Sequence, residues 1–135
     1  MMCEVGIEEL MMNVITEELE KPAVAIDAEW ERHPHEVHHA RRSGKKMLLL
    51  DVRHEVEWEL ANIEGSMLIP LPAIPERLKE LEPWRTEQVV VFCRSGVRSL
   101  QAAALLRKAG FNTVHSLAGG IELWAELVDP SIRWW

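Results

Sequence analysis

The chain alternates short apolar runs with longer segments in which apolar residues recur every three or four positions. The short runs predict strands, because strands in a buried sheet are brief and rich in Val, Ile and Leu. Two of them, MLLLDV and QVVVF, are apolar almost throughout, which is typical of strands covered on both faces. The five predicted strands are 23–26 (AVAI), 47–52 (MLLLDV), 67–71 (MLIPL), 88–92 (QVVVF) and 112–117 (NTVHSL).

The segments between these runs have the apolar spacing of amphipathic helices, and most end at a glycine or proline, as helices often do. Strands that alternate with helices through short connections predict an α/β fold: a central, mostly parallel five-stranded sheet with helices on both faces. We expect Trp58 and Trp124 to pack in its core and Trp134 and Trp135 to end an exposed tail. The predicted helical segments are 33–44, 54–65, 72–83, 99–110 and 119–130.

The beginning of the chain stands outside this alternation. Apolar residues there follow the spacing i, i+3, i+4, i+7, i+8 and predict an amphipathic helix over residues 7–19, packed on the domain or on a second copy. The apolar positions are Ile7, Leu10, Met11, Val14 and Ile15. The predicted regions are an N-terminal extension (1–22), a folded domain (23–130) and a C-terminal tail (131–135).

Composition narrows the functional classes. The 135 residues include 15 Lys and Arg against 22 Asp and Glu, a net charge of −7, which argues against a nucleic-acid binder and requires any anion to be held by a local positive pocket. The two cysteines, Cys3 and Cys93, do not make a disulfide framework and fit a reducing compartment, so we expect a cytoplasmic protein. The chain has no apolar run of the roughly 20 residues that a membrane span needs, and we expect no membrane association.

Cys93 stands where a buried strand ends and a helix begins a few residues later. In a parallel sheet this carboxyl edge is where ligands bind. The loop 94–98 contains Gly96, whose backbone freedom lets successive N–H groups turn toward one point and form an anion nest. Ser99 is predicted to cap a helix over residues 100–109, whose positive end faces the sulfur.

A cation-rich loop and a helix N-terminus both favour the thiolate form of a cysteine, which is the nucleophile. A buried structural cysteine is the alternative, and the Arg, Gly and Ser residues that follow Cys93 make it the weaker one. We expect Arg98 to point inward and fix the loop, and Arg94 to meet an anionic substrate at the rim. The predicted binding loop is Arg94, Ser95, Gly96, Val97, Arg98 and Ser99.

Four segments resemble successive blocks of the rhodanese (sulfurtransferase) domain, over about residues 23–130: LLLDVR (48–53), ANIEGSMLIPL (61–71), VVVFCRSGVRS (89–99) and LLRKAGFNTVHSLAGGIELWA (105–125). The resemblance implies the rhodanese-like fold. In that family a cysteine takes a sulfane sulfur from a donor such as thiosulfate, carries it as a persulfide, and passes it to cyanide or a biological thiophile. It implies that Cys93 is the sulfur carrier and that Asp51 and Arg53 give structural support through charge-assisted hydrogen bonds.

The segments ANIEG and LWAELVDPSI are similar to single-domain rhodaneses and to rhodanese domains associated with adenylyltransferases of molybdopterin and thiamin biosynthesis. In the latter, the persulfide feeds thiocarboxylate formation on a small carrier protein. The resemblance thus implies a small anionic sulfur donor such as thiosulfate, and a cysteine desulfurase or a small sulfur-carrier protein as partner. It requires no metal and no organic cofactor. The final RWW differs from the ending expected for this group.

Two other functions fit the same scaffold: a phosphatase or arsenate reductase, and a non-catalytic interaction module. The cysteine phosphatases place five residues between Cys and Arg, whereas four separate Cys93 from Arg98 here. A shorter loop brings its amides closer to the sulfur, which suits a single added sulfur atom and crowds a phosphoryl group. The module is disfavoured because the nucleophile is present.

Overall fold

The computed structural model describes residues 26–134, which form a sheet of five strands in the order β2-β6-β5-β3-β4. Every pairing among these strands is parallel, and β5 lies at the centre between β6 and β3. The predicted α/β fold with a five-stranded parallel sheet is confirmed. The strands are β2 (Glu31–Arg32), β3 (Met47–Asp51), β4 (Met67–Leu68), β5 (Gln88–Phe92) and β6 (Thr113–Leu117).

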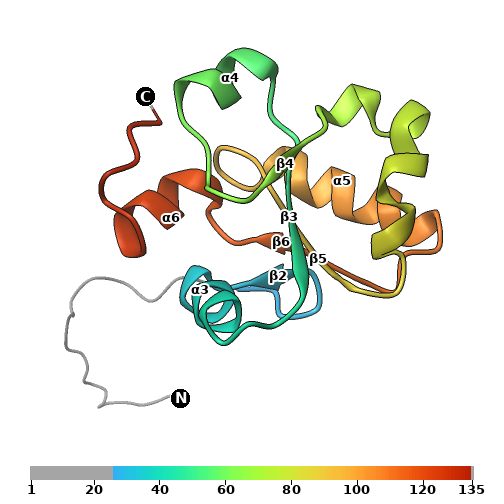
Figure 1. The fold of residues 1–135 in the computed structure, drawn as a ribbon, viewed down its shortest axis with the longest axis horizontal. Coiled ribbons are helices and arrows are strands. Elements are labelled where there is room, and N and C mark those ends of the chain that lie inside the picture. The colour runs from blue at the N-terminus through green and yellow to red at the C-terminus, as the bar shows by residue number, and fades with distance from the viewer. Residues whose placement is uncertain (1–25, 135) are drawn as a thin grey trace.

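Helices cover both faces of the sheet (Figure 1). On one face lie α3 (Pro34–Arg42) and α6 (Gly120–Leu127), and on the other lie α5 (Val97–Lys108) and the 3-10 segments η1 (Leu71–Ala73) and η2 (Pro75–Trp84). The short helix α4 (Glu55–Leu60) follows β3 and lies beyond the carboxyl ends of the strands. This edge is therefore bordered by α4 and by the N-termini of α5 and α6.

Side chains of β5 alternate between two cores because successive residues of a strand point to opposite faces. Val89 and Val91 pack with α5 residues such as Leu106, whereas Val90 and Phe92 pack in the other core. That second core includes Val37 of α3 and Ile121 and Trp124 of α6. Cys93 continues the Val89 and Val91 row and belongs to the α5 core. The register of one buried strand thus decides that the thiol faces the N-terminus of α5.

The predicted first strand is wrong where the structure describes it. Residues 23–25 of the predicted strand lie outside the described part of the chain, and Ile26 belongs to no strand. The edge strand is instead β2, which pairs with β6 and has no apolar run. The preceding Trp30 accepts a hydrogen bond from the Ser116 N–H (2.7 Å) and lies under the Arg107 guanidinium, 3.8 Å from ring centroid to Cζ. These long-range contacts define the edge. The extension 1–22, with its predicted helix, also lies outside the described residues and stays a prediction.

Two predicted elements between β3 and β5 are shorter or tighter than expected. The strand predicted at 67–71 ends at Leu68, and η1 begins at Leu71. The helix predicted at 72–83 is two 3-10 segments, with a non-helical backbone at Arg77 (φ −115°, ψ 18°). Proline at positions 72, 75 and 83 explains the difference, because a proline nitrogen donates no hydrogen bond to a helix.

The two tryptophans predicted for the core differ. Trp124 is buried in the α3 and α6 core, as expected. Trp58 is only partly buried because α4 is short and has no buried residue. Helical spacing therefore identified the covered side of α6 correctly but overstated the burial of α4.

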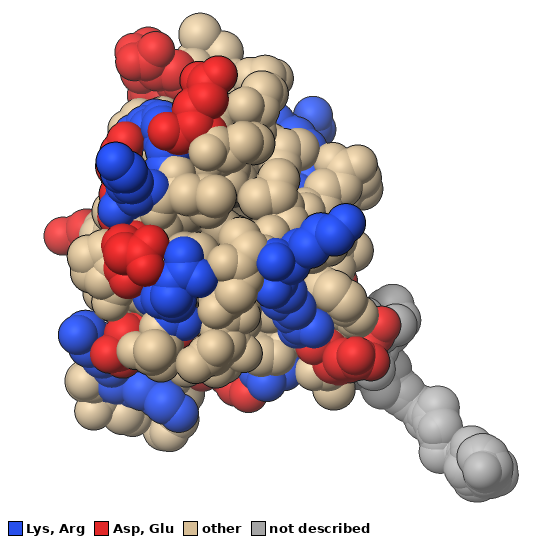
Figure 2. Space-filling view, turned by 90° about the vertical axis from the view of Figure 1, so that its right-hand side faces the viewer, with Lys and Arg blue, Asp and Glu red and all other residues tan. Residues whose placement is uncertain are grey.

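Charged side chains of both signs are interspersed over the face formed by α5 and η2 (Figure 2). Exposed pairs such as Arg77 with Glu80 (2.8 Å) and Arg85 with Glu82 (2.6 Å) account for part of this pattern. Such pairs add little stability, but they leave this face without a broad field of one sign. Within residues 26–134, no helix has the length and apolar character that crossing a membrane requires.

The buried imidazole of His115 predicts an acid-sensitive fold. It lies on β6, and its Nδ1 has no hydrogen-bond partner among the described residues. Burial, followed by the charges of Arg32 and Arg107, lowers the pKa of His115 from 6.5 to about 4. Because the folded state favours the neutral imidazole, this contribution to stability is present above pH 6.5 and is lost as the pH falls toward 4.

We therefore expect the free energy of unfolding, measured by urea denaturation, to decrease from pH 6.5 to about 4, and to decrease less in His115→Gln. The glutamine keeps a polar side chain that does not titrate. Parallel pH profiles for the parent and the variant would show that His115 is not responsible.

Candidate active site

Cys93 follows β5 directly, and its side chain is 1 % exposed. Its Sγ accepts hydrogen bonds from the N–H groups of Gly96 (3.1 Å) and Ser99 (3.4 Å). Gly96 has a φ of 120°, a region that favours glycine, and this lets the chain turn from β5 into α5 within four residues, 93–96. The sulfur therefore lies at the N-terminus of a helix, where N–H groups and the helix dipole stabilise negative charge.

The predicted start of α5 is wrong by one turn. The helix begins at Val97 with Gly96 as N-cap, so Val97 and Arg98 belong to its first turn and Ser99 is not the cap. The first N–H groups of a helix have no partner within it, and the sulfur of Cys93 accepts one of them. The Ser99 hydroxyl, freed from capping, is buried 2.7 Å from the Ser116 hydroxyl of β6 and accepts from the Cys93 thiol at 3.4 Å.

The N-terminus of α6 holds the backbone of the same loop. The N–H groups of Ile121 and Glu122 donate to the carbonyl oxygens of Cys93 (2.9 Å) and Arg94 (3.1 Å). This approach requires glycine at position 120, where a Cβ would lie 2.4 Å from the Arg94 carbonyl oxygen. The sequence analysis did not predict this contact, although two successive glycines before a helix, Gly119 and Gly120, could have indicated a close approach of backbone.

Arg98 ties α5 to α4. Its guanidinium donates to both carboxylate oxygens of Glu57, at 2.8 and 3.0 Å. The hydrogen bond from Arg98 is the main reason that the pKa of Glu57 falls to about 2, and Glu57 in turn raises the pKa of Arg98. Arg98 thus has the geometry expected of a residue that fixes the loop. Glu57 was not predicted, because the pair spans 41 residues of sequence.

Asp51 and Arg53 form a buried ion pair at the carboxyl end of β3. The Arg53 Nη2 donates to Asp51 Oδ2 (2.7 Å) and to the carbonyl oxygen of Ala61 (2.6 Å), which follows α4. The backbone N–H of Arg53 also donates to Asp51 Oδ1 (2.9 Å). The pair joins the end of β3 to the chain after α4, which is a structural arrangement of the kind the sequence suggested.

Arg94, which we expected to meet an anionic substrate at the rim, already has a carboxylate partner in the structure. Its side chain is 58 % exposed, and its Nε donates to Glu122 Oε2 of α6 at 2.6 Å. Its guanidinium also lies over the ring of Trp134, with Cζ 4.9 Å from the ring centroid. Trp134 was predicted to lie in an exposed tail, but it packs against the core shared by α3 and α6. Trp135 lies outside the described residues.

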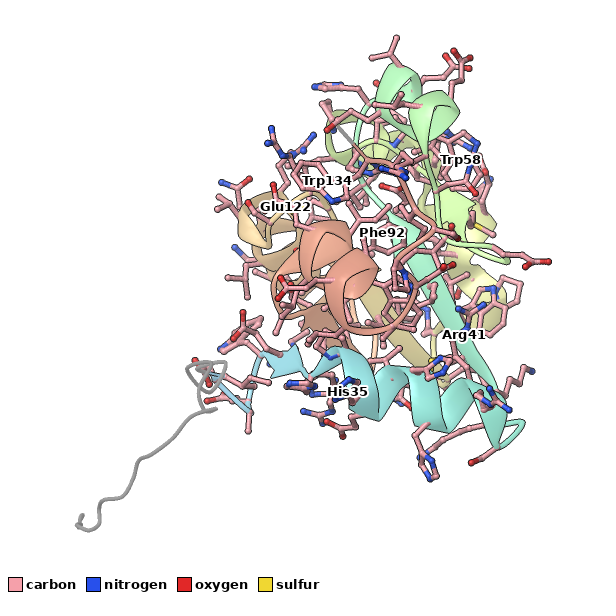
Figure 3. The ribbon with its side chains drawn as sticks, turned by 90° about the vertical axis from the view of Figure 1, so that its left-hand side faces the viewer. His35, Arg41, Trp58, Phe92, Glu122 and Trp134 are labelled. Carbon is pink, nitrogen blue, oxygen red and sulfur yellow. The ribbon has the colours of Figure 1, made fainter. Side chains whose placement is uncertain are left out.

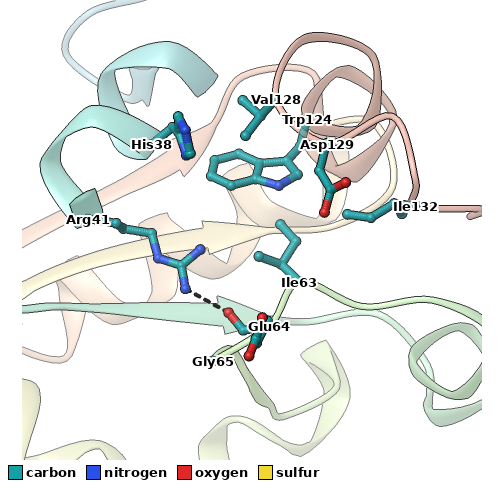
Figure 4. Close-up of a pocket in the computed structure, with 9 residues that line it drawn as sticks. All are labelled: His38, Arg41, Ile63, Glu64, Gly65, Trp124, Val128, Asp129 and Ile132. Carbon is teal, nitrogen blue, oxygen red and sulfur yellow. Dashed lines mark hydrogen bonds between the residues drawn. The ribbon is translucent and has the colours of Figure 1, made fainter.

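A cavity of about 480 Å³ lies elsewhere, between α3, the loop before β4, and α6 (Figure 4). Arg41 crosses it and donates to the carbonyl oxygen of Glu64 (2.6 Å). Cys93 is not among its lining residues, which are His38, Arg41, Ile63, Glu64, Gly65, Trp124, Val128, Asp129 and Ile132. Size alone therefore does not identify the reactive centre.

The described residues contain no group of three or more His, Cys, Asp or Glu side chains placed to hold a metal ion. What the loop offers is a free thiol whose sulfur accepts two N–H bonds at a helix N-terminus. This arrangement suits a nucleophilic thiolate, because the N–H groups and the helix N-terminus stabilise negative charge on sulfur.

A family model described as "Rhodanese-like domain" matches residues 33–127, which include Cys93, Glu57 and Glu122. The chain belongs to the rhodanese-like domain family. This confirms the resemblance in the sequence, and the family together with its sulfurtransferase relatives supports sulfur transfer as the general chemistry.

Named relatives include a probable adenylyltransferase/sulfurtransferase, MoeZ, of Mycobacterium tuberculosis, 42 % identical over 73 % of this chain and 25 % of that protein. A sulfurtransferase of Allochromatium vinosum is 39 % identical over 58 % of this chain and 72 % of its own length. The chain thus spans about a quarter of the MoeZ relative. A crystal structure of a Pseudomonas aeruginosa thiosulfate sulfurtransferase is similar to this chain with a TM-score of 0.68 and 25 % identity, over 80 % of this chain and 21 % of that one.

Because Gly120 lies so close to the loop, adding one methyl group at this position should strongly reduce the stability of the fold. In Gly120→Ala, the Cβ would meet the Arg94 carbonyl, and a φ of 61° is unfavourable for alanine. We expect a loss of about 2 kcal/mol or more in the free energy of unfolding, measured by urea denaturation.

The matched control is Gly44→Ala, because Gly44 also has a positive φ (81°) but has open space around its Cβ position. It should lose only the backbone strain of about 1 kcal/mol. Equal losses in the two variants would contradict a tight contact between α6 and the loop.

Proposed function

We propose that this protein is a sulfurtransferase that carries sulfane sulfur as a persulfide on Cys93. The observation that supports it most is the pair of N–H groups, from Gly96 and Ser99, that donate to the Cys93 sulfur. The donor is thiosulfate or another persulfide-type donor, and the acceptor is a thiophile, which is cyanide in an assay. Membership of the rhodanese-like family and relatives named as sulfurtransferases support the same chemistry.

The reaction has two displacements at sulfur. The Cys93 thiolate attacks the outer sulfur of thiosulfate, and the S–S bond to the sulfite group breaks as sulfite leaves with the electron pair. Cyanide then attacks the outer sulfur of the persulfide, forms thiocyanate, and returns the thiolate. The backbone N–H groups of the loop stabilise the anionic sulfur in both states. The cycle balances without a metal or an organic cofactor.

We also propose that the physiological exchange involves a protein, either a cysteine desulfurase as donor or a small sulfur-carrier protein as acceptor, in a reducing cytoplasmic compartment. Four large apolar side chains of the described residues are exposed, all on the two helices that border the site: Val56 (72 %) and Leu60 (57 %) on α4, and Val97 (67 %) and Leu100 (36 %) on α5. The ion pair between Arg98 and Glu57 holds these helices together. Exposed apolar groups beside a reactive centre suit a protein partner.

A phosphatase or arsenate reductase is the less favoured alternative. The loop has only four residues between Cys93 and Arg98, and the last of them, Val97, already belongs to α5. With two amides within 3.4 Å of the sulfur, the loop is better matched to one added sulfur atom than to a phosphoryl group. A non-catalytic interaction module would not need the N–H groups of Gly96 and Ser99 to donate to the Cys93 sulfur.

The proposal predicts that thiosulfate adds the mass of one sulfur atom to the protein, located on Cys93 by intact mass and peptide mapping. Thiosulfate:cyanide sulfurtransferase activity should accompany it and should disappear in Cys93→Ser, because the hydroxyl does not form a persulfide. The matched control is Cys3→Ser, which should retain both the added mass and the activity.

Aryl phosphates should not be hydrolysed above background by the same preparation. Hydrolysis of a phosphate ester without persulfide formation would overturn the proposed function in favour of the phosphatase. Retention of sulfur transfer in Cys93→Ser would overturn the assignment of the cysteine.

A further inference from the structure

Three arginines lie around the loop at the carboxyl edge of the sheet, and each forms an ion pair with a carboxylate. Because each pair joins one positive and one negative group, the local charge of these six side chains sums to about zero. The chain as a whole has a net charge of −7. The pairs are Arg53 with Asp51 (2.7 Å), Arg94 with Glu122 (2.6 Å) and Arg98 with Glu57 (2.8 Å).

The pair at the rim differs from the other two. Arg53 and Asp51 are buried and Arg98 and Glu57 are partly buried, whereas the Arg94 side chain is 58 % exposed. Its backbone carbonyl is bound by the N–H of Glu122, the same residue whose carboxylate accepts from its Nε. Arg94 is therefore held at both its backbone and its side chain by one residue of α6.

Trp134 is a second contact of this arginine. It comes from the end of the chain, after α6, and its ring lies under the Arg94 guanidinium at 4.9 Å. Figure 3 shows Glu122 and Trp134 at the same end of α6, and both also line a cavity of about 310 Å³. A cation over an aromatic face is attracted by the ring, so Trp134 keeps the guanidinium beside Glu122. Trp134 lies beyond the matched family residues 33–127.

We propose that Glu122 determines the sulfur donor by charge, and that Trp134 is a positioning residue that keeps Arg94 paired with it. This inference rests on the proposed function of Cys93. Because Glu122 neutralises Arg94, a dianionic donor such as thiosulfate gains no net attraction at the rim. The site is therefore suited to donors of lower charge, the class that includes monoanionic thiosulfonates and persulfides of thiols.

Two small donors that give the same persulfide but carry different charges can test the effect of donor charge. Methanethiosulfonate, a monoanion, and thiosulfate, a dianion, both present a terminal sulfane sulfur to the Cys93 thiolate. With methanethiosulfonate, the thiolate forms a bond to the outer sulfur, the S–S bond breaks, and methanesulfinate leaves with the electron pair. The persulfide on Cys93 is the same as that formed from thiosulfate. The two donors differ in that a methyl group replaces one oxygen, so methanethiosulfonate and its leaving group each carry one negative charge less than thiosulfate and sulfite.

The test compares kcat/KM for the two donors in the parent protein and in Glu122→Gln, which keeps an oxygen that accepts from Arg94 but removes the negative charge. At low ionic strength, kcat/KM should rise about tenfold for thiosulfate and about threefold for methanethiosulfonate, as Coulomb repulsion at several Å in water implies. The ratio of the two should therefore rise about threefold. Added salt should reduce this difference, because the charges are exposed.

Glu82→Gln is the matched control, because Glu82 forms a similar exposed pair with Arg85 next to η2. It should leave kcat/KM unchanged for both donors. Trp134→Leu should raise the ratio of kcat/KM for thiosulfate to that for methanethiosulfonate by less than Glu122→Gln does, since it loosens Arg94 without removing the carboxylate. An unchanged ratio in Trp134→Leu would remove Trp134 from the proposal. Equal changes for both donors in Glu122→Gln, or the same change in Glu82→Gln, would overturn the role of Glu122.

The parent protein provides a second measurement that needs no variant. If the rim is neutral, kcat/KM for thiosulfate should stay level or rise as salt is added, whereas a rim with a free cation would lose rate steeply. A steep loss would contradict the inference even if a variant failed to fold. Failure of both donors to form a persulfide on Cys93 would instead contradict the proposed function. The two failures are therefore distinguishable by intact mass.

Discussion

Two helix N-termini meet at the end of one buried strand, and the arrangement of the site depends on this meeting. The first turn of a helix leaves N–H groups without partners, and they must find acceptors elsewhere. At the N-terminus of α5 one acceptor is the sulfur of Cys93, and at the N-terminus of α6 the acceptors are the carbonyl oxygens of Cys93 and Arg94. The loop after β5 is therefore held on its side chain by one helix and on its backbone by the other.

Ion pairs then connect this loop to its surroundings. Arg98 and Glu57 join α5 to α4, and Arg53 and Asp51 join the end of β3 to the chain that follows α4. A buried ion pair contributes little net stability, because removing its charges from water offsets their attraction. What these pairs provide is a defined geometry and a site whose positive groups are already matched by negative ones. We infer that the same charge matching limits the attraction of the site for highly charged substrates.

The family match and the remaining chain contribute different parts of the site. Cys93, its amides and the partners of Arg98 all lie within the matched residues 33–127. Trp134, which contacts Arg94, lies after them. The chain also spans only about a quarter of its MoeZ relative but most of the length of the Allochromatium vinosum sulfurtransferase it matches. Arg94 thus has one partner within the match, Glu122, and one contact after it, Trp134.

The sequence by itself determined the alternation of strands and helices and the place of Cys93 at a carboxyl strand end, because both follow from local apolar periodicity and from the glycine after the cysteine. It did not determine the two-residue edge strand β2, the start of α5 at Val97, or the partners Glu57 and Glu122. The ion-pair partners depend on contacts between residues 28 and 41 positions apart. The start of α5 differs because the Cys93 sulfur, and not the Ser99 side chain, accepts a hydrogen bond from the first turn. Several groups in the chain could accept from a free helix N–H or pair with a charged side chain. The tertiary structure decides which one does, because it brings only that group within hydrogen-bonding distance.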